Sequence, residues 1–303
     1  MNPYAHKLTA WCMFLAILSP PVLAQDAAAQ VKPLRVTAIP DANKDTLKED
    51  QATISAWLEK QIGVPVLFIP VENYNAAVTA LVSGQAEMAW LGGVTTVQAM
   101  MLSKGKVLPL VTRENDLKFK SYVIARTELG AKSLKDLKGK AFTFGSKSST
   151  SGHVMPRHFL VQEGVQPEKF FSRVAYSGDH TKTVLDVATG AVDAGAVNYT
   201  YFDRMVAEVK KDPKKYPADL SKVQVLWTTP EFVDYAWCVR SDVDQRCGPG
   251  VTARIKAAFT GLDAKGEADQ RILKVQSTQK YVAAKPEWWD GIKAVLESTD
   301  ISK

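Results

Sequence analysis

After its first 24 residues, the sequence contains no apolar run of the length that a membrane-spanning helix needs. Its basic residues are scattered, and the densest group, EVKKDPKKYP at 208–217, is typical of a helix end and turn in solvent. The net charge of +6 over 303 residues is therefore not arranged as the basic stripe that would favour nucleic acid. The composition is that of a globular chain.

The first 24 residues have the layout of a secretory signal peptide. A short basic start with Lys7 precedes the apolar run LTAWCMFLAIL, and SPPVLA ends in small residues before Gln25. This segment is too short and wrongly flanked for a membrane span, so we expect cleavage after residue 24 and a periplasmic protein. An uncleaved anchor is the alternative. Cys12 lies inside the apolar run and not at its end, where a lipid-attachment cysteine would lie.

Cysteine is scarce, and only Cys238 and Cys247 follow the expected signal peptide. In an exported protein, a pair separated by eight residues is most often a structural disulfide that closes a small loop. A metal site is the alternative, but no histidine lies within thirty residues of either cysteine. We therefore predict a Cys238–Cys247 disulfide, no metal and no cofactor.

About 280 residues remain after cleavage, which is more typical of two domains than of one. The first part alternates short apolar strands with amphipathic helices. Strands are expected at 33–40, 64–71 and 86–93, and helices at 47–63, 74–85 and 94–105. This β-α-β-α-β order predicts parallel pairing with helices on both faces of a sheet.

A second run of the same kind begins after the extended segment 119–127. Further elements are expected at 133–145, 153–164, 170–178, 181–192, 193–205, 223–230, 234–242, 251–262 and 285–299. We predict two α/β lobes, each a mostly parallel sheet flanked by helices. Lobe 1 would comprise 31–118 and 229–303, lobe 2 would comprise 119–228, and the last helices would return to lobe 1.

Ligands of open α/β sheets bind at the carboxyl ends of the strands, which in two such lobes border the cleft between them. One strand-to-helix turn there, GSKSSTSGHVMP at 145–156, is unusually rich in hydroxyls. Pro156 is tolerated only in the first turn of a helix, so it locates the helix start. Ser149, Thr150 and Ser151 would then surround the positive end of the helix, which favours an anion. A flexible linker and an ordinary helix cap are the alternatives.

The segment FTFGSKSSTSGHVMP resembles the Ser-Thr-Ser-Gly segment of periplasmic phosphonate-binding proteins, the solute receptors of phosphonate and phosphite ABC importers. LRVTAIP, YNAAVTALVSGQAEMAWLGG and YSGDHTKTVLDVATGAVDAGAVN are also similar to that family, in its order. The resemblance covers nearly the whole mature chain. It implies a type II-like periplasmic binding protein, with two lobes joined by a two-strand hinge. It also implies a monomer that closes on its ligand and delivers it to an ABC permease and its ATPase.

The resemblance also implies ligand-binding residues. Ser149, Thr150, Ser151 and Gly152 match the segment that grips the oxyanion, and His180 matches a histidine turned toward the same oxygens. The alternative for His180 is a cap on the following helix. The remaining candidates are Tyr74, Trp90, Thr95, Thr96, Asn198 and Tyr199. Tyr74 and Trp90 have a role in the hydrophobic core as their alternative.

Two differences between this sequence and the family pattern bear on which ligand is bound. Receptors for aminoalkylphosphonates carry carboxylates for the ammonium group and a tyrosine after the glycine pair. This chain has Thr95 and Thr96 after the pair, and no acid in AVNYTYF before Asp203. We therefore predict a small oxyanion with little organic tail, such as phosphite. Selenate, sulfate-like and arsenic oxyanions stay open, although an arsenite receptor would need a thiolate at the cleft.

Two other functions have to be weighed. Ser149, Ser151, Asp179 and His180 include the residue types of a catalytic triad, but no G-x-S-x-G elbow is present, and Asp179 adjoins His180 in sequence. We therefore expect no enzyme. A receptor that signals to a sensor kinase would have the same pocket, because the same closure drives either output.

Overall fold

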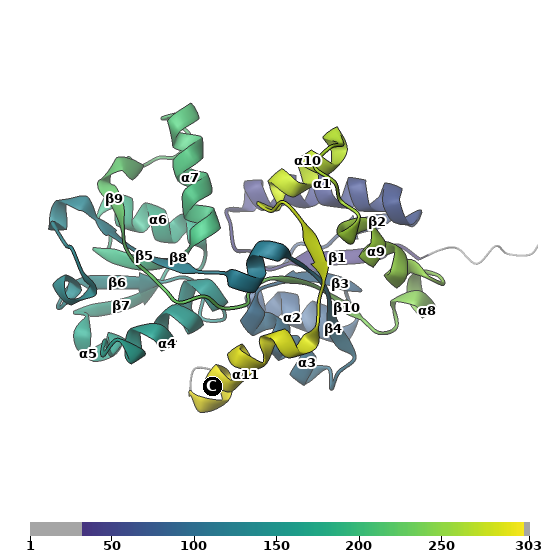
Figure 1. Cartoon of the computed structure of the whole chain (residues 1–303), viewed down its shortest axis with the longest axis horizontal. Coiled ribbons are helices and arrows are strands. Elements are labelled where there is room, and N and C mark those ends of the chain that lie inside the picture. The colour runs from purple at the N-terminus through teal and green to yellow at the C-terminus, as the bar shows by residue number, and fades with distance from the viewer. Residues whose placement is uncertain (1–31, 300–303) are drawn as a thin grey trace, which may run out of the picture. The chain divides into compact units, whose positions relative to one another are not determined.

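The computed structural model describes residues 32–299, which contain two mixed β-sheets with helices on their faces (Figure 1). The expected signal peptide lies outside the described residues. The first sheet has six strands in the order β11 (Tyr281–Ala283), β4 (Val107–Arg113), β10 (Ala236–Arg240), β3 (Met88–Leu91), β1 (Leu34–Ala38) and β2 (Val66–Phe68). The second has five, in the order β7 (Arg173–Tyr176), β6 (Ala141–Phe144), β8 (Ala194–Asn198), β5 (Ser121–Arg126) and β9 (Val223–Thr228). The parts of the chain built on these sheets are called lobe 1 and lobe 2.

Parallel pairing is confined to one part of each sheet. Strand β1 pairs in parallel with β2 and β3, and β6 pairs in parallel with β7 and β8. These strands belong to the alternating β-α segments that the sequence predicts. The other pairs, which involve β4, β5, β9, β10 and β11, are antiparallel. The sheets are therefore mixed and not mostly parallel.

The helices of lobe 1 are α1 (Lys44–Ile62), α2 (Tyr74–Ser83), α3 (Gly93–Leu102), α8 (Val243–Cys247), α9 (Val251–Thr260), α10 (Glu267–Val275) and α11 (Asp290–Ser298). Helices α9 and α10 pack on α1, and α11 packs on α3, as Figure 1 shows on opposite sides of the sheet. The last helices thus pack on lobe 1, as expected. No helix within residues 32–299 is long and apolar enough to cross a bilayer.

The helices of lobe 2 are α4 (Met155–Gln162), α5 (Pro167–Phe170), α6 (His180–Thr189) and α7 (Tyr199–Lys211). One apolar cluster joins Phe142 and Phe144 of β6 to Leu160 of α4. A second joins Ile124 of β5 to Val184 of α6 and to Phe202 of α7. Helices on both faces therefore bury the second sheet, and its strand ends lie where α4, α6 and α7 begin.

Two segments connect the lobes. The first runs from β4 to β5 through a 3₁₀ turn at Glu114–Lys118, and the second runs from β9 to β10. They are joined where Phe119 and Phe232 exchange backbone hydrogen bonds of 2.8 and 2.9 Å. Because both crossings are extended and paired, they form the two-strand hinge that the family resemblance implies.

The expected disulfide is wrong: within the described residues, Cys238 and Cys247 are both free thiols and both buried. Cys238 lies on β10, and its Sγ is 3.5 Å from the hydroxyl of Thr96 on α3. Cys247 is the last residue of α8, and its Sγ is 3.7 Å from the carbonyl oxygen of Pro33. The two side chains thus contact different elements. Burial raises the pKa of Cys238 to about 12 and that of Cys247 to about 11, so neither is a reactive thiolate.

Candidate functional site

The hydroxyl-rich turn lies between β6 and α4, as expected. Ser149 precedes a single π-helical turn, Thr150–Val154, and its Oγ accepts the Gly152 N–H at 2.9 Å. Helix α4 follows, with Pro156 in its first turn. The side chains of Ser149, Thr150 and Ser151 are all buried. The turn is therefore an ordered element of the interior and not a flexible linker.

Gly152 allows the close approach of three parts of lobe 2. A Cβ at this position would lie 2.9 Å from Ser149 Oγ and 3.1 Å from His180 Cε1. The Gly152 carbonyl oxygen also accepts the Gly145 N–H at 2.8 Å. A side chain here would push the serine turn away from His180, so glycine is required by packing.

Four buried polar atoms without a hydrogen-bond partner in the described part of the chain lie around this turn. They are Tyr74 Oη, Ser151 Oγ, His180 Nε2 and Asp234 Oδ2. Burial raises the pKa of Asp234 to about 7, while the Gly93 N–H and the Thr150 and Ser151 hydroxyls beside it act to lower it. Burial also raises the pKa of Tyr74, against the effect of the Ser149 hydroxyl. Unpaired buried polar groups are costly, so such a cluster indicates a site for a polar ligand.

His180 is the first residue of α6 and is completely buried. Burial lowers its pKa to about 3, so its imidazole is neutral at physiological pH. Its Nδ1 accepts the Asn198 N–H at 3.4 Å, which leaves the proton on Nε2. His180 Nε2 is thus a neutral donor in the cluster. Asp179, and not His180, caps α6 by accepting the Lys182 N–H at 2.7 Å.

Asp41, which follows β1, joins lobe 1 to lobe 2 beside this cluster. Tyr201 Oη donates to Asp41 Oδ1 at 3.1 Å, and the His180 N–H donates to the Asp41 carbonyl oxygen at 3.1 Å. Burial raises the pKa of Asp41 to about 6, while Tyr235, Tyr201 and Arg204 act to lower it. Both lobes therefore contribute polar groups to the same buried region.

Aromatic rings form one wall of the site. Trp90 on β3 stacks on Tyr235, with ring centroids 5.2 Å apart. The Arg113 guanidinium lies 5.0 Å from both ring centroids and is paired with Asp116 in the hinge. Trp90 and Tyr235 also line, with Asp41 and Tyr201, a cavity of about 30 Å³. Neither the serine turn nor His180 lines this cavity.

Asn198 ends β8 and is completely buried. Its Nδ2 donates to Tyr235 Oη at 3.1 Å, and its Oδ1 accepts the N–H of Thr200 at 2.8 Å as the cap of α7. Asn198 therefore positions Tyr235 and His180, and both ends of its amide bond to groups within the protein.

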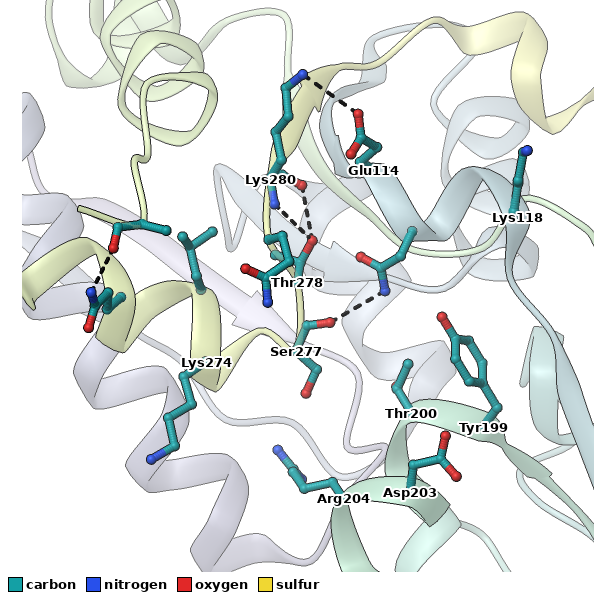
Figure 2. Close-up of a pocket in the computed structure, with 15 residues that line it drawn as sticks. Glu114, Lys118, Tyr199, Thr200, Asp203, Arg204, Lys274, Ser277, Thr278 and Lys280 are labelled. Carbon is teal, nitrogen blue, oxygen red and sulfur yellow. Dashed lines mark hydrogen bonds and ion pairs between the residues drawn. The ribbon is translucent and has the colours of Figure 1, made fainter. Parts of the chain in front are cut away.

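The structure places three other candidates away from the cluster. Thr95 Oγ1 donates to the Gly92 carbonyl oxygen at 2.9 Å within α3, and Thr96 Oγ1 faces Cys238. Tyr199 packs on Phe119 and lines a separate open groove of about 970 Å³ beside the hinge (Figure 2). Lys118, Arg204 and Lys274 surround that groove, but the serine turn and His180 do not line it.

Sequence reasoning missed Asp41, Tyr201, Asp234 and Tyr235. Its expectation that the cleft lacks carboxylates is wrong, because Asp41 and Asp234 are both buried in it. The Asp234 N–H donates to the Asp116 carbonyl oxygen at 3.0 Å, which holds Asp234 at the end of the second crossing. The sequence signal was its position just before the strand at 236–240, where the chain returns between the lobes.

The chain is similar to known proteins over most of its length. A family model described as the periplasmic substrate-binding protein of a phosphonate ABC transporter matches residues 36–289. A probable ABC transporter phosphite-binding protein, PhnD1 of Prochlorococcus marinus strain MIT 9301, is 34% identical over 297 residues, which cover 96% of each chain. A phosphate-import protein of Mycolicibacterium smegmatis is 27% identical over 323 residues, covering 98% of this chain and 97% of that protein.

A solved structure extends the similarity to three dimensions. The structure of Prochlorococcus marinus PhnD1 in complex with methylphosphonate superimposes with a TM-score of 0.81 and 34% identity. The match covers 88% of this chain and 98% of that one. It therefore includes both sheets and the hinge between them.

Proposed function

Because the chain belongs to the phosphonate-binding family of periplasmic substrate-binding proteins of ABC transporters, we propose that it captures a small phosphorus oxyanion, with phosphite as the preferred ligand. The ligand would be enclosed between the lobes and delivered to the permease and ATPase of the importer. The observation that carries this proposal is the set of unpartnered groups around the serine turn. Tyr74 Oη, Ser151 Oγ and His180 Nε2 supply three donors next to the amino terminus of a helix.

Asp234 favours a phosphorus oxyanion over sulfate. Its Oδ2 is a buried oxygen without a partner, beside the donors. A ligand that carries a proton on oxygen, as phosphite and phosphonate monoanions do, can donate that proton to the carboxylate. Sulfate and selenate carry no proton at neutral pH, so Asp234 itself would have to bind a proton before it could face them, which costs free energy at any pH above its pKa of about 7. Like charges in a buried site are strongly unfavourable.

The size of the site favours a short substituent on phosphorus. The stacked rings of Trp90 and Tyr235 wall the site, and the cavity that they line with Asp41 and Tyr201 is only about 30 Å³. A hydrogen atom or a methyl group on phosphorus adds little volume, whereas an aminoethyl chain would need space that these rings now fill. Asp41 already accepts from Tyr201, so its carboxylate is partly used within the protein.

The remaining parts of the proposal concern the mature protein. We infer that residues 31–118 with 229–303 and residues 119–228 move as two rigid lobes about the paired crossings at Phe119 and Phe232. Cleavage of a signal peptide after residue 24 would release the protein as a periplasmic monomer. Closure of the lobes is the signal that a permease would recognise.

Thermal unfolding in the presence of candidate ligands tests the proposal. Phosphite, methylphosphonate, 2-aminoethylphosphonate, phosphate, sulfate, selenate and arsenite would be compared at equal concentration and ionic strength. A ligand at a hundred times its Kd adds about 2.7 kcal/mol to the free energy of unfolding. We expect the largest rise in Tm from phosphite. A larger rise from 2-aminoethylphosphonate, or from sulfate, would overturn the proposed ligand.

A further inference from the structure

Helix α3 lacks a cap of its own. Helices α1, α2, α6 and α7 each begin after a residue, Asn43, Asn73, Asp179 or Asn198, whose side chain accepts an N–H of the first turn. The corresponding residue of α3 is Gly92, which has no side chain to do this. The first N–H groups of a buried helix still need acceptors, and those of α3 must find them elsewhere.

Two residues distant in the sequence supply these acceptors. The Gly93 N–H donates to Asp234 Oδ1 at 2.8 Å, and the Val94 N–H donates to Thr150 Oγ1 at 2.9 Å. Asp234 belongs to the second crossing, whereas Thr150 belongs to the serine turn of lobe 2. The bond between Val94 and Thr150 therefore connects a helix of lobe 1 to the ligand-binding turn of lobe 2.

Gly92 leaves room for Thr150 and Asp234 to approach the start of α3. A Cβ at Gly92 would lie 3.1 Å from Thr150 Oγ1 and 3.2 Å from Asp234 Oδ1, tighter than ordinary van der Waals contact. Both acceptors are buried. Because Gly92 has no side chain, lobe 1 supplies no side-chain cap at this position, and there is room for Thr150 of lobe 2 to cap α3 instead.

We propose that Thr150 is the residue that couples anion binding to closure, by capping α3 across the cleft. Its oxygen accepts from Val94, and its proton remains available to an anion oxygen or to Asp234. Ser149 and Ser151 flank Thr150 in the same turn, so an anion bound to this turn fixes Thr150 where the first N–H groups of α3 need an acceptor. The bond exists only when the lobes are together, so it favours the closed form. This inference rests on the capture by two lobes proposed above.

Amide exchange at Val94 tests the coupling directly. In phosphite-saturated protein, NMR should show a protected Val94 N–H. Thr150→Val keeps the shape and removes the acceptor, so Val94 exchange should become about 2- to 30-fold faster, the range expected for loss of a helix cap. Thr143→Val is the matched control, because Thr143 Oγ1 donates to Phe144 within lobe 2 at 2.9 Å. Val94 exchange in that variant should equal that of the parent.

Gly92→Ala removes no polar group, but its Cβ would crowd both Thr150 Oγ1 and Asp234 Oδ1, so its effect on the cap is read from Val94 exchange as well as from affinity. We expect it to weaken phosphite binding by about 2- to 30-fold, measured by calorimetry, since the added Cβ crowds the cross-lobe cap.

If Thr150 only touches the ligand, Thr150→Val would weaken phosphite binding with Val94 exchange unchanged, and Gly92→Ala would bind phosphite like the parent. That pair of results would overturn the coupling. If phosphite does not bind the parent, the choice of phosphite fails, while Val94 exchange in methylphosphonate-saturated parent and Thr150→Val still tests the cap.

Discussion

At the residue scale, His153 stabilises the serine turn by staying neutral. Its Nδ1 lies 2.7 Å from the Lys147 carbonyl oxygen and its Nε2 lies 3.3 Å from Tyr176 Oη. Nδ1 therefore carries the proton, and Nε2 accepts from the tyrosine. Burial is the main cause that lowers the pKa of His153 from 6.5 to about 4. The ring ties the start of the turn to β7.

This arrangement predicts a pH dependence. The unfolded chain binds a proton at His153 below about pH 6.5, whereas the native protein resists it until about pH 4. The contribution of His153 to the free energy of unfolding is thus complete above pH 6.5 and is lost as the pH falls from 6.5 to about 4. NMR titration of the ring should show no protonation between pH 8 and pH 5. A midpoint near 6.5 would show that the ring is not buried as described.

At the same scale, the sequence identified residues whose role is set by local chemistry and missed those set by distant packing. The serine turn was predicted from hydroxyls and a helix start close together in the chain, whereas His180 was predicted from the family resemblance. Asp41 gave no such signal and Asp234 gave only its position before a strand, because both are buried by contacts with residues distant in the sequence, Tyr201 and Gly93. The disulfide expectation failed for the same reason, since proximity in sequence does not bring Cys238 on β10 near Cys247 on α8.

At the element scale, the turn from β6 to α4 depends on a glycine. In Gly152→Ala, the Cβ would meet Ser149 Oγ at 2.9 Å and His180 Cε1 at 3.1 Å. Overpacking of this kind costs about 1–3 kcal/mol. Because both neighbours belong to the site, we expect phosphite affinity to fall by about tenfold or more, together with a lower Tm.

Gly291→Ala is the control for this change. Gly291 lies in α11, and a Cβ there would meet nothing within 4 Å. Alanine in a helix interior is favoured over glycine by about 1 kcal/mol, so stability should rise slightly and phosphite affinity should stay unchanged. Calorimetric titration and thermal unfolding of both variants measure the difference. Parental affinity in Gly152→Ala would mean that the turn can move without affecting the site.

The elements that the sequence predicted best are those with clear ends. Helix α2 begins at Tyr74, as predicted, and is followed by Gly84 in the left-handed conformation. Helix α1 ends before Gly63, as predicted, but begins at Lys44, three residues before the predicted start at 47. Short elements such as β11 and α8 were missed, because three to five residues carry too little periodicity. Antiparallel strands were mistaken for members of a mostly parallel sheet, since pairing depends on where the chain crosses between the lobes.

At the scale of the whole molecule, the protein is two lobes held together by polar contacts that surround one buried site. Asp41 with Tyr201, Val94 with Thr150, and Asp50 with Arg204 join the lobes. Each of these bonds requires the lobes to be together, and none of them joins parts of a single sheet. Ligand binding at the centre and closure at the edges are therefore expected to be one event.

Small-angle X-ray scattering of ligand-stripped protein with and without phosphite tests this account most directly. We expect saturating phosphite to decrease the radius of gyration, because the hinge at Phe119 and Phe232 lets the lobes close on the anion. Sulfate at equal ionic strength should leave the radius of gyration unchanged, because it has no proton to donate to Asp234. An unchanged radius with phosphite bound, or an equal decrease with sulfate, would contradict the capture of a phosphorus oxyanion by lobe closure.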